Sequence, residues 1–72
     1  MNLLELVINQ LTLEKNLLEV ELERVINNKD INTVDKVESS KKLLKQISEI
    51  LMTINLTNGY LSPLTNKEQN NN

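Results

Sequence analysis

Apolar residues recur every three or four positions through residues 3–26. This is the spacing at which side chains line one face of an α-helix. A seven-residue repeat runs through the same face, which is typical of the seam of a helical bundle or a coiled coil. The residues assigned to this face are Leu4, Val7, Ile8, Leu11, Leu18, Leu22, Val25 and Ile26.

A second group of apolar residues lies on an adjacent flank of the same predicted helix. At about 100° per residue, the two groups together span roughly 240° of the circumference. A neighbouring helix packs against a single stripe, so it covers only one of the groups. We therefore expect the second group to form a partner or dimer interface. Its members are Leu3, Leu6, Leu13, Leu17 and Val20.

Polar residues predict where this first helix begins and ends. Asn2 followed by Glu5 resembles a capping box, in which the Asn side chain accepts a hydrogen bond from an early backbone N–H. Residues 27–30 are Asn-Asn-Lys-Asp, and Asn and Asp favour turns over helix. The sequence thus predicts a helix over about 3–28 and a turn over about 29–32.

A second helix is predicted over about 33–57. Either Asn32 or Thr33 can serve as its N-cap, and Asp35 lies near its positive end. Because the connection is short, the two helices are expected to form an antiparallel hairpin. Residues 1–58 are therefore predicted to be one all-α, two-helix domain.

The apolar residues of the second helix fit one stripe. Val37, Leu44 and Leu51 share one heptad position, Ser40, Ile47 and Ile54 share the other, and Leu43 and Ile50 flank them. We expect this stripe to pack on the main face of the first helix. The predicted hairpin core is Leu4, Ile8, Leu11, Leu18, Leu22, Val25, Val37, Leu44, Ile47, Leu51 and Ile54.

The pattern changes after the Asn58-Gly59 pair. Gly readily takes the left-handed conformation that ends helices, so the second helix is expected to stop here. Residues 59–72 are predicted to be a largely disordered tail, because their last eight residues are polar and lack periodicity. A short apolar patch in this tail either docks into a partner groove or folds back over the end of the bundle. Its residues are Tyr60, Leu61 and Leu64.

Composition removes several classes of function. The chain has no cysteine and no histidine, so thiolate sites and the usual acid–base group are missing, and we identify no catalytic, cofactor-binding or metal-binding residue. The net charge of −2 and a single aromatic residue argue against nucleic-acid binding. No apolar run approaches membrane-spanning length. A cytoplasmic protein without a small-molecule substrate is expected.

One stretch resembles a known family. Residues 31–33 and 37–47 resemble the second helix of the short sporulation aspartyl-phosphate phosphatases, which are helical hairpins that dephosphorylate response regulators. The family signature there is Ser-Gln-Glu-Leu-Asp, and residues 40–44 read Ser-Lys-Lys-Leu-Leu. Ser40 and Leu43 match, whereas Leu44 replaces the functional Asp. The resemblance implies a hairpin fold and a degenerate, phosphatase-like role in phosphorelay signalling.

The sequence therefore favours a small, non-catalytic interaction protein that acts as a regulator, inhibitor, adaptor or assembly factor. Its expected partner is a protein, either a second copy that completes a four-helix bundle or a larger protein. The phosphorelay role is one alternative function. A structural component of a larger assembly, such as a phage particle, is the other.

Overall fold

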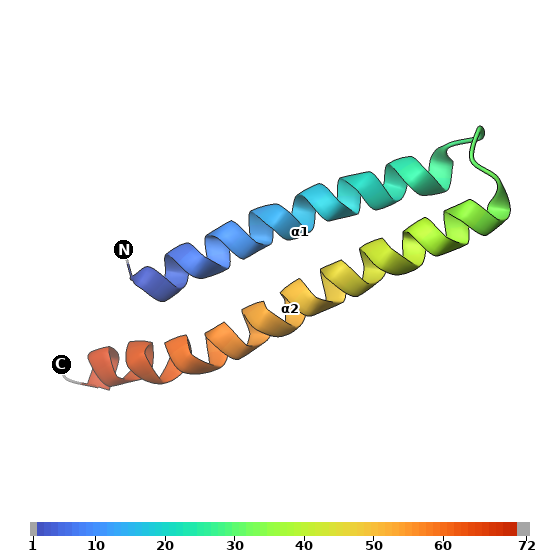
Figure 1. Cartoon of the computed structure of the whole chain (residues 1–72). Helices are drawn as coiled ribbons and strands as arrows, with labels where there is room; N and C mark the ends of the chain where they lie inside the picture. The colour runs from blue at the N-terminus through green and yellow to red at the C-terminus, as the bar shows by residue number, and fades with distance from the viewer. Residues whose placement is uncertain (1, 71–72) are drawn as a thin grey trace.

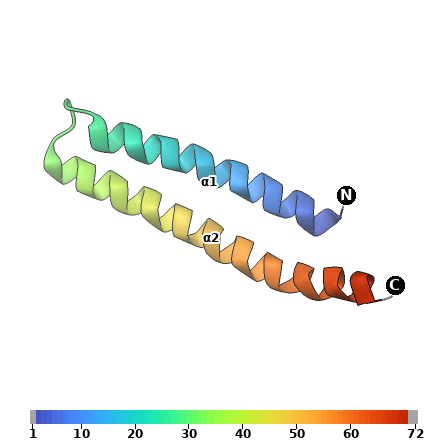
Figure 2. The ribbon, with the colours of Figure 1, turned by 180° about the vertical axis from the view of Figure 1, so that it is seen from behind.

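The structure is a computed structural model that describes the backbone of residues 2–70 and the side chains of residues 2–62. Helix α1 (Leu3–Asn27) and helix α2 (Thr33–Asn70) run antiparallel (Figure 1). The view from behind shows the same pair, with α2 along one side of α1 (Figure 2). The described residues contain helices and no strands, so the predicted all-α hairpin is confirmed. The molecule is elongated, measuring 59 × 17 × 14 Å.

Helix α1 begins at the predicted cap. The Oδ1 atom of Asn2 accepts a hydrogen bond from the backbone N–H of Leu4 at 2.7 Å. The backbone carbonyl of Asn2 accepts from the N–H of Leu6 at 3.2 Å. These bonds satisfy N–H groups that have no partner within the helix itself.

The connection is built from side chains that bond to nearby backbone. Oδ1 of Asn28 accepts from the N–H of Asp30 at 2.8 Å, which closes a local turn. Oδ1 of Asn32 accepts from the N–H of Asp35 at 2.8 Å, and Nδ2 of Asn32 donates to the Asp35 carboxylate at 3.1 Å. Of the two candidate caps for α2, Asn32 is therefore the one used.

A lysine of α2 also contacts the end of α1. Nζ of Lys36 donates to the backbone carbonyl of Ile26 at 3.0 Å. The last carbonyls of a helix lack partners within the helix and carry partial negative charge. Lys36 therefore satisfies one of them, and this bond helps to fix how α2 is rotated against α1.

The two helices bury few side chains against each other. Val25 and Ile47 are the buried apolar side chains among the described residues, and no side chain there is fully buried. Thr57 is buried as well, and its hydroxyl donates to the carbonyl of Thr53 at 2.7 Å. The remaining contact residues are half-buried. A hairpin of this size has a small core, as expected from its surface-to-volume ratio.

Most of the face that α1 turns toward α2 agrees with the prediction from the sequence, but Val7 and Ile26, which were assigned to it, are 37% and 53% exposed. Val25 is buried. Lys15 lies on the same face with its side chain mostly covered, and its Nζ pairs with Oε1 of Glu19 at 3.2 Å. Its carbon chain thus packs at the seam while its charge is paired. The half-buried apolar residues of this face are Leu4, Ile8, Leu11, Leu18 and Leu22.

The face that α2 turns toward α1 differs from the prediction. Val37, Leu44 and Leu51 are 47–53% exposed, so their assignment to the hairpin core is wrong. Leu43 and Ile50 are half-buried in their place.

The residues at the other heptad position, Ile47 and Ile54, do face α1 as predicted, buried and half-buried respectively. The apolar stripe through Ile47 and Ile54 can be extended by either neighbouring heptad position, that of Leu43 and Ile50 or that of Leu44 and Leu51. Lys36 shares a heptad position with Leu43, Ile50 and Thr57, so its bond to α1 agrees with this set lying on the side of α2 that faces α1.

Helix α2 also continues beyond its predicted end at about residue 57. Its backbone is helical through Gly59 and Pro63 to Asn70. Gly59 does not have the positive φ angle of a left-handed cap. Glycine inside a helix costs only about 1 kcal/mol relative to alanine, so it weakens a helix without ending it. The predicted tail is therefore helical in backbone over 59–70, and residues 71 and 72 lie outside the described residues.

Gly59 provides a test of this helix continuation. A Cβ added at Gly59 meets no atom within 4 Å, and its φ angle suits an L-amino acid. We expect Gly59→Ala to raise the free energy of unfolding by about 0.5–1 kcal/mol in urea denaturation. If Gly59 were a left-handed cap instead, the substitution would lower the stability. A synthetic chain with D-alanine at 59 is the control, and it should show the opposite sign.

Candidate interaction surface

The flank of α1 that the sequence marks as an interface is uncovered by α2. We call it the outer seam. Its side chains are exposed by at least 50%, and Leu3 is exposed by 72%. Isolated exposed apolar residues are ordinary, but a contiguous row marks an interaction site or a liability for aggregation. The outer seam consists of Leu3, Leu6, Leu13, Leu17 and Val20.

The spacing of the outer seam is that of a coiled coil. Its members alternate by three and four residues if exposed Gln10 is included between Leu6 and Leu13. At 1.5 Å per residue, the row from Leu3 to Val20 is about 26 Å long. On a helical wheel it lies about 140° from the face that packs on α2. A second helix can therefore pack along it without disturbing the hairpin.

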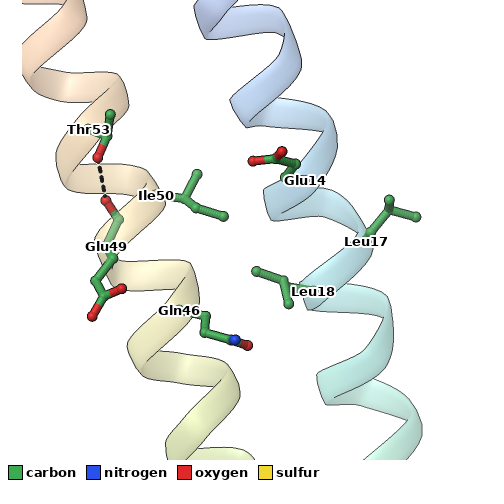
Figure 3. A pocket seen from close by; sticks show the side chains of 7 residues that line it. All are labelled: Glu14, Leu17, Leu18, Gln46, Glu49, Ile50 and Thr53. Carbon is green, nitrogen blue, oxygen red and sulfur yellow. Dashed lines mark hydrogen bonds between the residues drawn. The ribbon is translucent and has the colours of Figure 1, made fainter.

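A groove of about 510 Å³ lies beside the outer seam, between the two helices. Leu18 of α1 and Ile50 of α2 point toward one another across it, whereas Leu17 points outward (Figure 3). Leu17 belongs both to the groove lining and to the outer seam, so the two surfaces are continuous. The polar side chains that line the groove are Glu14, Gln46, Glu49 and Thr53.

Helix α2 carries a second exposed row, which we call the α2 strip. It consists of Val37, Leu44 and Leu51 at seven-residue spacing. Val37 and Leu44 line a groove of about 360 Å³ together with Ile26 of α1. Leu44 and Gln46 are about 200° apart on the helix, so the strip and the first groove lie on opposite edges of α2. The sequence analysis missed this surface because it assigned the strip to the core.

Charges on these surfaces pair within helices. Arg24 donates to both carboxylate oxygens of Glu21, with Nη2–Oε1 at 2.6 Å and Nε–Oε2 at 2.9 Å. These hydrogen bonds lower the pKa of Glu21 against a small opposing effect of desolvation, and they raise the pKa of Arg24. In the described part of the chain, Lys41 likewise pairs with Glu38 of its own helix. Such exposed pairs within one helix add little to its stability, because water screens them.

The apolar patch of the predicted tail lies on the helical part of α2. Tyr60 is exposed, while Leu61 is half-buried. The side chain of Leu64 lies outside the described residues. Since α2 continues as a helix here, Tyr60 and Leu61 point in directions about 100° apart. Docking of this patch stays a prediction.

Two further observations concern metal binding and the crossing of a membrane. In the described residues, no three Asp or Glu side chains gather closely enough to hold a metal ion. Neither described helix combines the length and the apolar character needed to cross a bilayer. What the described surface offers is exposed aliphatic side chains with carboxylates and lysines beside them.

Comparison with known proteins adds no assignment. No family model matches the chain, and no curated protein or solved structure shows significant similarity to it. The resemblance to the sporulation phosphatases therefore stays a prediction. The structure places Leu44, which stands at the position of their signature Asp, on the exposed α2 strip, and it places Ser40 half-buried nearby.

Two adjacent leucines test which face of α2 packs on α1. Leu43 is half-buried and Leu44 is 53% exposed. We expect Leu43→Ala to lower the free energy of unfolding by about 1–2 kcal/mol, because it removes apolar contacts with α1. We expect Leu44→Ala to change it by less than about 0.5 kcal/mol, as is usual for exposed positions. Urea denaturation of dilute protein gives both values, and a larger loss for Leu44→Ala would restore the assignment made from the sequence.

Proposed function

We propose that this chain is a small, non-catalytic helical interaction protein that acts in the cytoplasm as a regulator, inhibitor, adaptor or assembly factor. It works by self-association and by binding another protein through the outer seam. The observation that carries this proposal is the exposure of all five apolar side chains of that seam, from 50% at Leu6 to 72% at Leu3.

The energetics support a need for a partner. Burying one such side chain contributes about 1.5–3 kcal/mol. Five of them together are comparable with the net stability of a typical domain, about 5–15 kcal/mol. The hairpin itself buries only Val25 and Ile47 among its described apolar residues. Covering the outer seam would therefore remove from water a set of apolar side chains that the hairpin leaves exposed.

The form of the surface favours a helix as the bound element. A straight row with three- and four-residue spacing accepts the side chains of another helix. Leu17 extends the row into the groove, where Glu14 lies beside apolar Leu18 and Ile50. Aliphatic side chains would supply the affinity, and the carboxylates of Glu14 and Glu21 would discriminate between partners. Pairing of two hairpins in this way gives a four-helix arrangement.

A second candidate is a phosphatase-like regulator of phosphorelay signalling. The exposure of Leu44 favours it, because a surface that docks on a response regulator must be accessible. Leu44 has no carboxylate to take the part of the family's Asp. Incubation with phosphorylated response regulators tests this candidate: accelerated loss of phosphate would support it, and no effect at high concentration would count against it. As a structural component of a larger assembly, by contrast, the chain would gain helix only when its partner is added.

Paired substitutions test the role of the outer seam. We expect Leu13→Glu with Leu17→Glu to abolish association while most helix is kept, because both side chains are more than half exposed in the hairpin. The matched control, Leu11→Glu with Leu18→Glu, places the same charges in the hairpin contact and should unfold the helices. Sedimentation equilibrium at micromolar concentrations measures association, and circular dichroism measures helix.

Two outcomes would contradict the proposal. If the unsubstituted chain is a well-folded monomer at every concentration, the seam does not drive self-association. If both pairs of substitutions remove helix equally, the division of α1 into two separate faces is wrong.

A further inference from the structure

We propose that the outer seam of α1 packs against the outer seam of a second copy of this chain in an antiparallel two-helix contact, with the two-fold axis between Gln10 and Leu13. This inference rests on the proposed function, since it names the occupant of that same surface. It assigns a register and a direction that the sequence pattern alone leaves open.

The spacing of the seam is self-complementary when one copy is reversed. In the reversed copy, each seam position lies opposite the position with which it sums to 23. The opposite pairs are 3 with 20, 6 with 17, and 10 with 13. Leu3 then meets Val20 of the second copy, and Leu6 meets Leu17 of the second copy. Each outer layer pairs two apolar residues, and the two central layers each pair Gln10 with Leu13. A contact of this kind is closed and limited to two copies.

Gln10 is the residue that favours a second copy over an unrelated apolar helix. It is the one polar member of the row between Leu3 and Val20, and an amide buried against apolar side chains alone has donors and acceptors without partners, which disfavours such a contact. In the proposed register the two Gln10 side chains lie in neighbouring layers, about 4.5 Å apart along the helix axis. Each amide carries donors and acceptors, so the two can bond to one another across the axis.

Charge favours the antiparallel direction. A parallel pair in register would place Arg24, the next position of the row, against Arg24 of the second copy, and it would align the two helix dipoles. In the antiparallel pair, position 24 lies beyond the first residue of the other helix, so the two guanidinium groups stay apart. Glu21 then lies level with Asn2 of the second copy, at the positive N-terminal end of its α1.

The flanking positions are compatible with this arrangement. Glu14 lies beside the seam on the groove side, and its closest counterpart in the second copy is Val7. Glu14 therefore does not meet a like charge. Helix α2 does not obstruct the contact, because the outer seam lies about 140° around α1 from the face that packs on α2. The assembly would contain four helices with the two α1 helices at its centre.

Disulfide trapping tests the direction in the full chain, which has no native cysteine. Leu6→Cys and Leu17→Cys are made in separate chains and then mixed in a glutathione redox buffer. The antiparallel register brings these two positions together, so we expect the mixed disulfide dimer to exceed both homodimers well above the 1:2:1 statistical ratio. Gln10→Cys mixed with Leu13→Cys provides an independent pair. Asp30→Cys, in the exposed turn, is the control for random collision.

The possible results separate this inference from the proposed function. A parallel contact would give disulfide homodimers from each single variant, Leu6→Cys or Leu17→Cys, without an excess of the mixed dimer. That result would overturn the inference. In that case, the proposed function would still be supported if the Leu13→Glu, Leu17→Glu variant no longer associates. A mixed product no more abundant than the Asp30→Cys control would also overturn the inference. Circular dichroism of each cysteine variant confirms that the helices are retained.

Discussion

A helix in a two-helix hairpin can cover only one stripe of its neighbour, and this limit governs the whole molecule. Because α1 carries apolar residues over more than half of its circumference, α2 leaves a large part of α1 exposed whichever way it is rotated. Lys36 helps to set that rotation by bonding to the carbonyl of Ile26. The hairpin is thus held by a small core and by polar contacts at its closed end.

Because α1 can likewise cover only one stripe of α2, the second apolar row, the α2 strip, stays exposed. The heptad position of Lys36, Leu43, Ile50 and Thr57 faces α1, although the set that contains Leu44 is more apolar. A threonine in the contact is acceptable because its hydroxyl bonds to the carbonyl of Thr53 within α2. The more apolar set is left at the surface.

The sequence predicted most of the fold because the strongest signals were local. The cap at Asn2, the Asx turn after α1 and the seven-residue repeat of α1 all depend on neighbours within a few residues. The exposure of the outer seam followed from counting apolar stripes. These predictions required no knowledge of how the helices are rotated.

The two failures have different causes. The face of α2 was misassigned because two heptad positions flank Ile47 and Ile54, and hydrophobicity alone favoured the wrong one. In the structure the other position faces α1, and the exposed bond from Lys36 to the carbonyl of Ile26 lies on the same side. The helix end was misplaced because Gly59 is compatible with both a helix and a left-handed cap, and the helical backbone on either side decides between them.

The position of the α2 strip has a consequence for valency. It lies on the edge of α2 away from the groove that joins the outer seam, so a dimer formed through α1 would keep both of its α2 strips accessible. Such a dimer would present two identical sites at a fixed separation. A target with two matching sites would then be held far more tightly than either strip could hold it alone, because the second contact forms at high effective concentration.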